Sequence, residues 1–249
     1  MNSLDPNLAI VFFTSTKGHH KCKTLYKKTL AQFSSITPQI SLFVHIKVSP
    51  GEELIAKEME NWILQFYPYA YITQTVGVWS HVDGSSHHEY LKDIDTNFQQ
   101  AQKNNYKYAL FLEDDWLFNN DIDIEKEIAN ALDFLIIHSN FFCYRWVRSG
   151  DSDIIQRTEA KQLTTYGGAN LFSHTKEFSF NPCIVRIAEF SMVARFCNYF
   201  YPNLHPHCEM AVTNVINFLL PNSIFLFHDR PTITHIGTQE FIKTNHDTI

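Results

Sequence analysis

The residues with the clearest chemical potential are three consecutive acids, Glu113, Asp114 and Asp115. They follow the apolar residues Ala109–Leu112 without a break. Carboxylates packed this closely repel one another unless a positive group arrives among them. Carboxylate oxygens suit Mg²⁺ and Mn²⁺, and these cations in turn bind diphosphates. The segment therefore predicts a divalent-metal site that serves a diphosphate-bearing ligand.

The acidic segment also has a purely structural interpretation. Asp121 or Asp123 could cap the helix that the apolar spacing predicts over residues 124–137, and a cap needs no metal. The residues alone leave both interpretations open.

Strand and helix patterns alternate ahead of the acids and must position them. Short apolar runs predict strands over residues 8–14, 40–48, 69–76 and 108–112. Apolar residues at helical spacing predict helices between them, over residues 22–33, 55–66 and 91–101. This alternation is typical of an α/β fold with a mostly parallel central sheet flanked by helices. Such sheets bind ligands beyond the carboxyl ends of their strands, which is where the acids stand.

The second half of the chain is less regular. A strand is predicted over residues 141–147, and an irregular segment rich in Gly, Ser, Thr and Asn follows over residues 149–182. Helices are then predicted over residues 184–200 and 208–220, and short strands over residues 224–227 and 232–236. The sequence contains no internal repeat, so we expect one domain.

Composition and charge narrow the class of protein. The chain has 249 residues, of which 45% are hydrophobic and 18% charged, which is typical of a globular protein. The net charge of −6 argues against a nucleic-acid-binding protein. The five cysteines are scattered and form no C-x-x-C pair, which favours a reducing compartment.

The sequence predicts neither export nor membrane insertion. The N-terminus is polar up to Leu8, and the longest apolar runs are too short to span a bilayer. Lysines crowd the start of the chain, where they form either a solvated helix face or a surface for an anionic ligand or membrane; they are Lys17, Lys21, Lys23, Lys27 and Lys28. We therefore expect a cytoplasmic protein, for which peripheral membrane contact stays open.

Glu-Asp-Asp-Trp after a buried strand resembles the DxD-type motif of glycosyltransferases with the GT-A fold, with Glu in place of the commoner first Asp. Three further segments resemble parts of family-2-like members in the same order, namely Val11–Gly18, Ser179–Pro182 and His235–Gly237. The resemblance covers about residues 8–240. It implies a single GT-A, Rossmann-like domain over residues 1–249, with a nucleotide-binding half at about 8–118 and an acceptor-binding half at about 119–249.

The resemblance also implies an activity and assigns roles to residues. The activity is transfer of a sugar from a nucleotide-sugar donor to a hydroxyl of a glycan or glycoconjugate acceptor, with Mn²⁺ or Mg²⁺ as cofactor. Asp115 matches the acid expected to touch the metal, and a late histidine, His235, would complete the ligand set unless it is structural. The nucleotide would contact residues that match donor-binding positions, namely Thr14, Ser15, Glu113 and Asp114.

Transfer to a hydroxyl also needs a base that takes its proton. The resemblance places such a carboxylate at the start of a late helix, and Glu209 stands at that position. A single displacement with this base would invert the anomeric centre. The alternative is that Glu209 is a first-turn acid that merely suits the helix dipole.

Two other functions remain possible for the same fold. A sugar nucleotidyltransferase would make a nucleotide sugar rather than use one, but such enzymes usually carry a glycine-rich phosphate loop, and Thr14–Gly18 contains a single Gly. A non-catalytic carbohydrate-binding protein would not need the acids or Glu209.

Overall fold

The computed structural model describes residues 7–16, 25–33, 40–77, 85–148, 154–166, 169–180, 182–200, 208–221 and 223–235. The strands are β1 Leu8–Ser15, β2 Leu42–Val48, β3 Tyr71–Val76, β4 Tyr108–Glu113, β5 Trp116–Phe118, β6 Phe141–Arg148, β7 Lys161–Tyr166, β8 Ala169–His174, β9 Cys183–Arg186 and β10 Ile224–His235. The helices are α1 Leu25–Phe33, α2 Glu53–Phe66, α3 Ser85–Lys103, α4 Ile124–Ile137, α5 Ile154–Thr158, α6 Ile187–Phe200 and α7 Cys208–Leu219.

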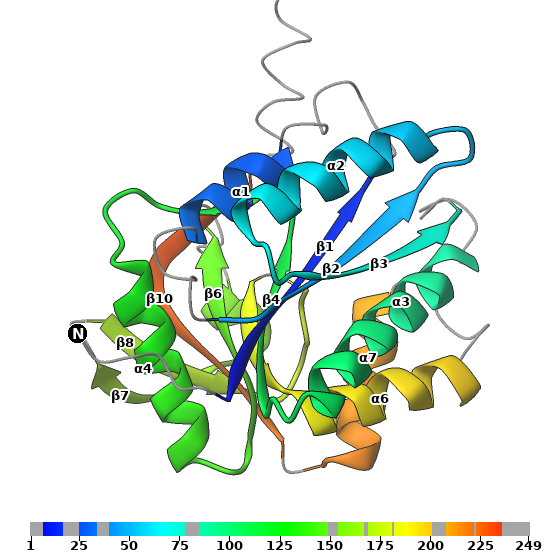
Figure 1. Cartoon of the computed structure of the whole chain (residues 1–249). Helices are drawn as coiled ribbons and strands as arrows, with labels where there is room; N and C mark the ends of the chain where they lie inside the picture. Colours follow the sequence, from blue (N-terminus) through cyan, green and yellow to red (C-terminus); the bar gives the residue numbers. More distant parts are fainter. Residues whose placement is uncertain are drawn as a thin grey trace, which may run out of the picture.

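The described strands form a 10-stranded sheet in the order β3-β2-β1-β4-β9-β6-β10-β8-β7, with β5 paired to β10 (Figure 1). Strands β3, β2, β1 and β4 pair in parallel, as do β6 and β10. Strand β9 lies antiparallel between β4 and β6, so β6 and β10 run in the direction of β4. Strands β8 and β5 are antiparallel to β10. The expected fold class, a single mostly parallel sheet flanked by helices, is therefore confirmed.

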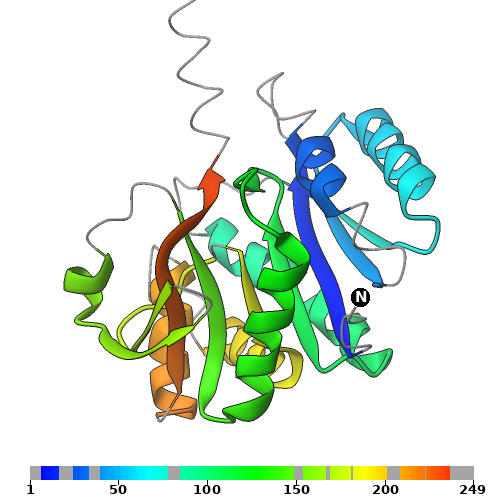
Figure 2. The same cartoon turned by 90° about the vertical axis from the view of Figure 1, so that its left-hand side faces the viewer.

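Helices cover both faces of the sheet (Figures 1 and 2). The side chains of the central strands alternate between the two faces. Ile10 and Phe12 of β1 pack into the core shared with α1, α2 and α4, whereas Val11 and Phe13 pack into the core shared with α3, α6 and α7. Because both faces are buried, the central strands read as continuous apolar runs rather than alternating ones. This explains why their positions could be predicted from the sequence.

Three expectations about the second half were wrong. The segment 149–182 contains α5 and the antiparallel pair β7 and β8 rather than only irregular chain. Residues 184–186 belong to β9, and the helix begins at Ile187. Since Ile184 faces one core and Val185 the other, the run has the period of a strand, which so short an apolar segment cannot reveal.

The two short strands expected near the C-terminus are one strand, β10. Polar residues and Pro231 interrupt its apolar pattern, and the pairing with β6 shifts register on either side of Pro231. Proline is tolerated within a sheet at such irregularities because it has no N–H to donate. Residue 236 lies outside the described part of the chain.

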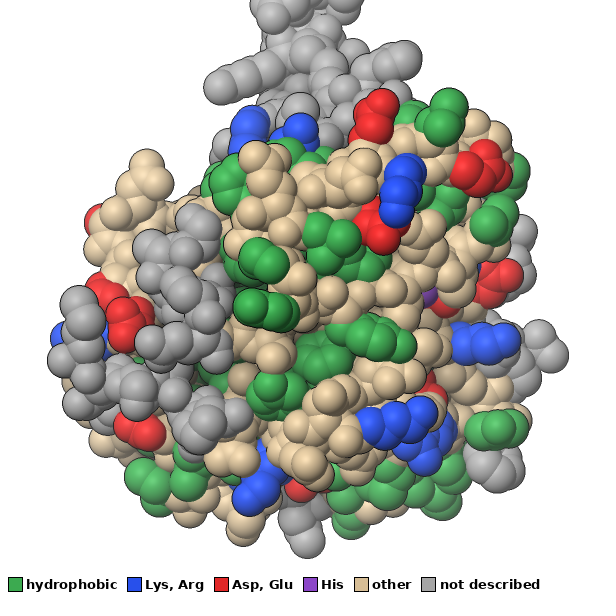
Figure 3. All heavy atoms as spheres, viewed as in Figure 1, with side chains coloured by type: hydrophobic (Ala, Val, Ile, Leu, Met, Phe, Trp, Pro, Cys, Tyr) green, Lys and Arg blue, Asp and Glu red, His purple; other side chains and the backbone are tan. Residues whose placement is uncertain are grey.

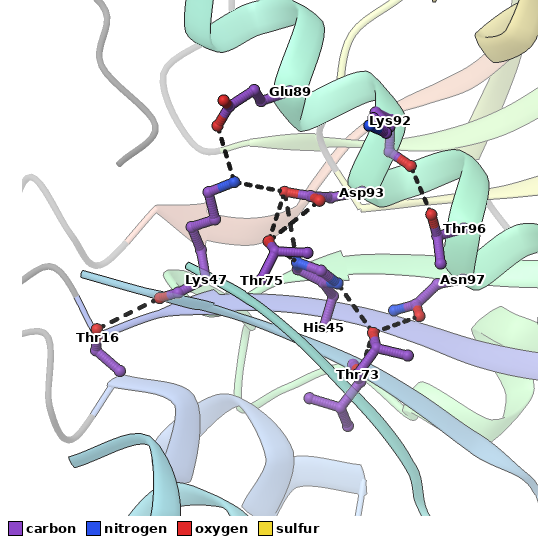
Figure 4. A network of polar contacts seen from close by, with 11 residues as sticks. Thr16, His45, Lys47, Thr73, Thr75, Glu89, Lys92, Asp93, Thr96 and Asn97 are labelled. Atoms are coloured by element: carbon purple, nitrogen blue, oxygen red, sulfur yellow. Dashed lines mark hydrogen bonds and ion pairs between the residues drawn. The ribbon is translucent and has the colours of Figure 1, made fainter. Parts of the chain in front are cut away.

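A buried polar network fastens α3 to the edge of the sheet (Figure 4). Lys47 of β2, only 2% exposed, donates to Glu89 Oε2 at 2.9 Å and to Asp93 Oδ2 at 3.1 Å. Asp93 also lies 3.4 Å from His45 Nε2 and accepts a hydrogen bond from Thr75. Glu89 is followed by Tyr90, whose hydroxyl donates a hydrogen bond to Glu113 at the end of β4. The network therefore fixes the part of α3 that faces this end of the strand.

On the face shown in Figure 3, acidic and basic side chains are interspersed with apolar ones. No helix in the described ranges is both long and apolar enough to cross a bilayer. Lys17, Lys21 and Lys23 lie outside the described residues, so peripheral membrane contact stays a prediction.

The network around Lys47 predicts a large stability effect for a single charge. Lys47→Met leaves the Asp93 carboxylate, 4% exposed, without its ammonium partner. Removing one member of a buried pair costs about 3 kcal/mol or more of unfolding free energy. Urea denaturation measures this loss. The control is Lys57→Met, because Lys57 is 62% exposed in its pair with Glu60; a surface pair contributes less than about 1 kcal/mol. Equal losses in both variants would contradict a stabilising role for the network.

Candidate active site

Three strands deliver candidate residues to the same edge of the sheet. Strand β1 ends at Ser15, β4 at Glu113 and β10 at His235, and the three run in one direction. Across the sheet, the strand numbers descend from β3 to β1 and then jump to β4, so the strand order reverses between β1 and β4. Doubly wound sheets bind ligands at such a switch point, beyond the carboxyl ends of the strands. The acidic turn Glu113-Asp114-Asp115 stands at this point.

Neighbouring hydroxyl groups hold the acidic turn in place. Thr14 Oγ1 donates to Asp114 Oδ2 at 2.6 Å, and the peptide N–H of Ser15 also donates to that carboxylate. Thr29 of α1 is fully buried, and its Oγ1 lies within hydrogen-bond distance of two carbonyl oxygens, that of Asp114 at 2.7 Å and that of Trp116 at 3.0 Å. The turn is thus fastened to β1 on one side and to α1 on the other.

Two of the three acids are strongly perturbed. Burial, followed by the charge of Asp115, raises the pKa of Glu113 to about 8, although the Tyr90 hydroxyl donates a hydrogen bond to Glu113 Oε1 that opposes the shift. Burial and Asp115 likewise raise the pKa of Asp114 to about 7, against the hydrogen bonds from Thr14 and Ser15. The donors orient these carboxyl groups but do not offset the cost of burying neighbouring negative charges.

Asp115 and His235 form a pair at the open side of the turn. His235 Nε2 lies 2.7 Å from Asp115 Oδ2, and the two side chains are 30% and 28% exposed. The register of β10 and β5 sets His235 opposite Trp116, whose ring centroid lies 4.6 Å from the imidazole. Two elements remote in sequence therefore bring an oxygen and a nitrogen ligand atom together where a solute can reach them.

This donor set fits a hard divalent cation that shares its shell with a ligand. No group of three or more His, Cys, Asp or Glu side chains within the described ranges is arranged to hold a metal by itself. Mg²⁺ is commonly bound through one or two protein ligands, with substrate phosphates and waters completing the shell, and imidazole is acceptable to Mn²⁺. Asp115 and His235 could supply those two ligands.

Glu209 lies close to the acids although it is remote in sequence. Its Oε1 accepts hydrogen bonds from Ser179 Oγ at 3.0 Å and from the Phe180 peptide N–H at 2.7 Å. The ring of Phe180 packs edge-on against Tyr90, with centroids 5.4 Å apart, and Tyr90 in turn contacts Glu113. The charge of Glu209 adds to the raised pKa of Glu113. Glu209 also borders a cavity of about 290 Å³.

The predicted donor-binding residues differ in accessibility. Thr14 is 2% exposed and uses its hydroxyl to hold Asp114, whereas Ser15 is partly exposed at the end of β1. Their contact with a nucleotide stays a prediction. Of the segments that carry the family resemblance, residues 17–18, 181 and 236–237 lie outside the described part of the chain.

The helix cap that competed with a metal site has its own residue. Asp123 caps α4, and its Oδ1 accepts from the Lys126 peptide N–H at 3.1 Å. Glu113, Asp114 and Asp115 do not perform this role, so capping does not explain them.

The contact of Tyr90 and the role of Thr29 were not predicted from the sequence. Tyr90 carries no local signal, because its contact with Glu113 depends on how α3 lies across the sheet. Thr29 did carry one: it is a polar residue on the otherwise apolar, buried side of α1, where a hydroxyl requires a partner.

No protein-family model matches the sequence, and comparison with curated proteins finds no relative. Among solved structures, a mannose-1-phosphate geranyltransferase from Thermus thermophilus is 10% identical, with a TM-score of 0.48 over 93% of this chain and 76% of that one. A glycosyltransferase involved in glycosylation of the major capsid of PBCV-1 is 11% identical, with a TM-score of 0.42 over 92% of each chain. A candidate glucose-1-phosphate thymidylyltransferase from Bacillus anthracis, in complex with a sucrose, is 9% identical, with a TM-score of 0.49 over 94% of this chain and 93% of that one. Similarity this low carries no argument about chemistry, which rests on the residues themselves.

The raised pKa of Glu113 predicts how the metal-free protein responds to pH. A carboxyl group with a higher pKa in the folded state destabilises the fold progressively as pH rises from its unfolded to its folded pKa. For Glu113 this interval runs from 4.5 to about 8. The free energy of unfolding should fall across it by up to about 1.4 kcal/mol per pH unit, and Glu113→Gln should remove this part of the decline. Urea denaturation with a chelator at several pH values measures it.

The matched control is Glu58→Gln, since Glu58 is exposed on α2. This variant should keep the wild-type pH profile. A Glu113→Gln profile parallel to that of the wild type would show that Glu113 does not titrate in this interval.

Proposed function

We propose that this protein is a divalent-metal-dependent glycosyltransferase that moves a sugar from a nucleotide-sugar donor to a hydroxyl of a glycan or glycoconjugate acceptor. The observation that carries the proposal is the Asp115–His235 pair, 2.7 Å apart beside two further acids at the sheet's switch point. Glu209, whose charge acts on Glu113, also lines a cavity that could receive a second substrate.

The donor's diphosphate is assigned to the Asp115–His235 side of the site. Asp115 and His235 would hold Mn²⁺ or Mg²⁺, which when bound supplies positive charge against the charge that develops on the leaving diphosphate. Glu113 and Asp114 are assigned to the ribose and to water bound in the same region. Ser15, partly exposed at the end of β1, is assigned to the nucleotide base, and Thr14 supports it by holding Asp114.

Glu209 is assigned as the base. Within the described part of the chain, both hydrogen bonds to its side chain end on Oε1, which fixes the carboxylate and leaves Oε2 to take a proton. The proton of the acceptor hydroxyl passes to Glu209 as the oxygen attacks the anomeric carbon. The bond from that carbon to the phosphate oxygen breaks, and nucleoside diphosphate leaves. A single displacement of this kind inverts the anomeric centre.

A donor panel tests the function itself. Each common sugar nucleotide is incubated with Mn²⁺, with Mg²⁺ and with chelator, and release of nucleoside diphosphate is measured. Parallel mixtures of nucleoside triphosphate and sugar 1-phosphate are assayed for pyrophosphate. Metal-dependent nucleoside diphosphate release supports the proposal, whereas pyrophosphate release alone would replace it with a sugar nucleotidyltransferase.

Asp115→Asn should weaken metal-dependent donor binding. The substitution removes the carboxylate charge and keeps the side chain's shape. We expect the stabilisation of the wild type by Mn²⁺ plus nucleoside diphosphate, seen as a rise in Tm, to be lost. Asp133→Asn, at an exposed position on α4, is the control and should keep it. Retained stabilisation in Asp115→Asn would place the metal elsewhere.

Glu209→Gln should separate binding from transfer. The amide oxygen can still accept the hydrogen bonds of Ser179 and Phe180, so donor binding should persist. Loss of the base should slow transfer by about 10²- to 10⁴-fold. Glu189→Gln is a matched control, because Glu189 and Glu209 are both first-turn acids of their helices. Normal transfer by Glu209→Gln would leave Glu209 as a helix-dipole acid only.

A further inference from the structure

We propose that the cavity beside Glu209 binds a negatively charged group of the acceptor, a carboxylate or a phosphate. This inference rests on the proposed function for the identity of the ligand as an acceptor. The cavity, called here the arginine pocket, has a volume of about 290 Å³. The residues of its wall that carry the argument are Arg145, Arg148, Arg157, Glu177, Ser179 and Glu209.

Arg145 is a buried cationic residue of the pocket wall, and its position is fixed by the sheet. It lies on β6 and is 2% exposed, with its guanidinium carbon 5.7 Å from the centre of the Phe227 ring. The β-sheet register fixes its backbone, since it pairs with Phe227 of β10 and with Cys183 of β9. A guanidinium held this way loses little conformational entropy when it binds an oxyanion.

Arg157 and Arg145 share one carboxylate. Arg157 Nη1 lies 3.1 Å from Glu177 Oε1, and Arg145 Nη2 lies 3.9 Å from the same oxygen. Arg148, exposed at the end of β6, borders the same cavity. The described part of this wall thus carries three arginines beside two acids, Glu177 and Glu209.

A neighbouring histidine responds to the charge of these arginines. Burial, followed by the charges of Arg145 and Arg157, lowers the pKa of His174 to about 3. His174 is therefore neutral at physiological pH, and the positive charge near the pocket comes from the arginines.

The pocket joins the arginines to the base. Glu177 and Ser179 lie in one short segment: Glu177 pairs with Arg157, and Ser179 donates to Glu209 Oε1 at 3.0 Å. A molecule whose charged end lies at the arginines can therefore present another of its atoms to Glu209. An oxyanion suits the arginine end because guanidinium groups form paired, charge-assisted hydrogen bonds to carboxylate and phosphate.

Paired probes test the inference. Binding of methyl glucuronoside is compared with that of methyl glucoside, and glucose 6-phosphate with glucose, by isothermal titration calorimetry. We expect at least one acid of the two pairs to bind at least tenfold more tightly than its neutral partner, an order of magnitude typical of hydrogen bonds to charged groups. The pair that shows the preference identifies carboxylate or phosphate as the group recognised.

Arg157→Gln should abolish this preference. Arg157 is 49% exposed, and Arg195→Gln is a closely matched control because Arg195 is 48% exposed on α6, outside the pocket. Arg148→Gln provides a second exposed substitution in case Arg157→Gln does not fold. The control should keep the wild-type preference, and a preference that survives both pocket substitutions would overturn the proposal.

Separate donor measurements keep this test apart from that of the proposed function. Stabilisation by Mn²⁺ plus nucleoside diphosphate should be unchanged in Arg157→Gln. If it falls together with acid binding, the arginines serve the donor's diphosphate and the inference is overturned. If neither acid binds more tightly than its neutral partner, it is overturned as well. If the wild type binds acids but no nucleoside diphosphate, the anionic site stands and the transferase function fails.

Discussion

The constraint on which the site depends is the crowding of neighbouring, partly buried carboxylates at the end of β4. Glu113 and Asp114 receive hydrogen bonds from Tyr90, Thr14 and the Ser15 peptide, yet the pKa of each is raised, to about 8 and about 7. Burial and mutual repulsion thus outweigh the donors. Such an arrangement lowers the stability of the fold, because the repulsion between the carboxylates is relieved only by protonation or by a bound cation. The cost is consistent with a binding role for the turn.

Holding such groups in place requires a rigid frame on every side. Hydrogen bonds from Thr14 and Thr29 fasten the acidic turn to β1 and α1, and a hydrogen bond from Tyr90 reaches it from α3. Helix α3 is itself fastened to the sheet through Lys47, whose ammonium joins Glu89 and Asp93 one residue before and three residues after Tyr90. The buried polar network between β2 and α3 therefore holds in place the helix that carries Tyr90 to Glu113.

The sequence predicted the parts of this arrangement that are local. The strand that runs into Glu113 follows from an apolar run, and the helix over 124–137 follows from its spacing. The sequence left Asp121 and Asp123 open as its cap, and the structure identifies Asp123. Strand β9 could not be predicted, because four residues fit a strand or the start of a helix equally well. The contact of Tyr90 with Glu113 and the approach of Glu209 to the acids depend on how helices cross the sheet. The family resemblance, and not local periodicity, singled out Glu209 as the candidate base, and that role stays a prediction.

The acidic and the basic side chains of the candidate site lie at two different ends. Carboxylates gather at the switch point, and arginines gather around Glu177 at the far side of Glu209. Glu209 stands between them, held by hydrogen bonds from the Ser179 hydroxyl and the Phe180 peptide N–H. A cation is therefore attracted to one end and an anion to the other. In the proposed transfer, a cation-bound donor diphosphate and an anionic group of the acceptor would then lie on opposite sides of Glu209, the candidate base.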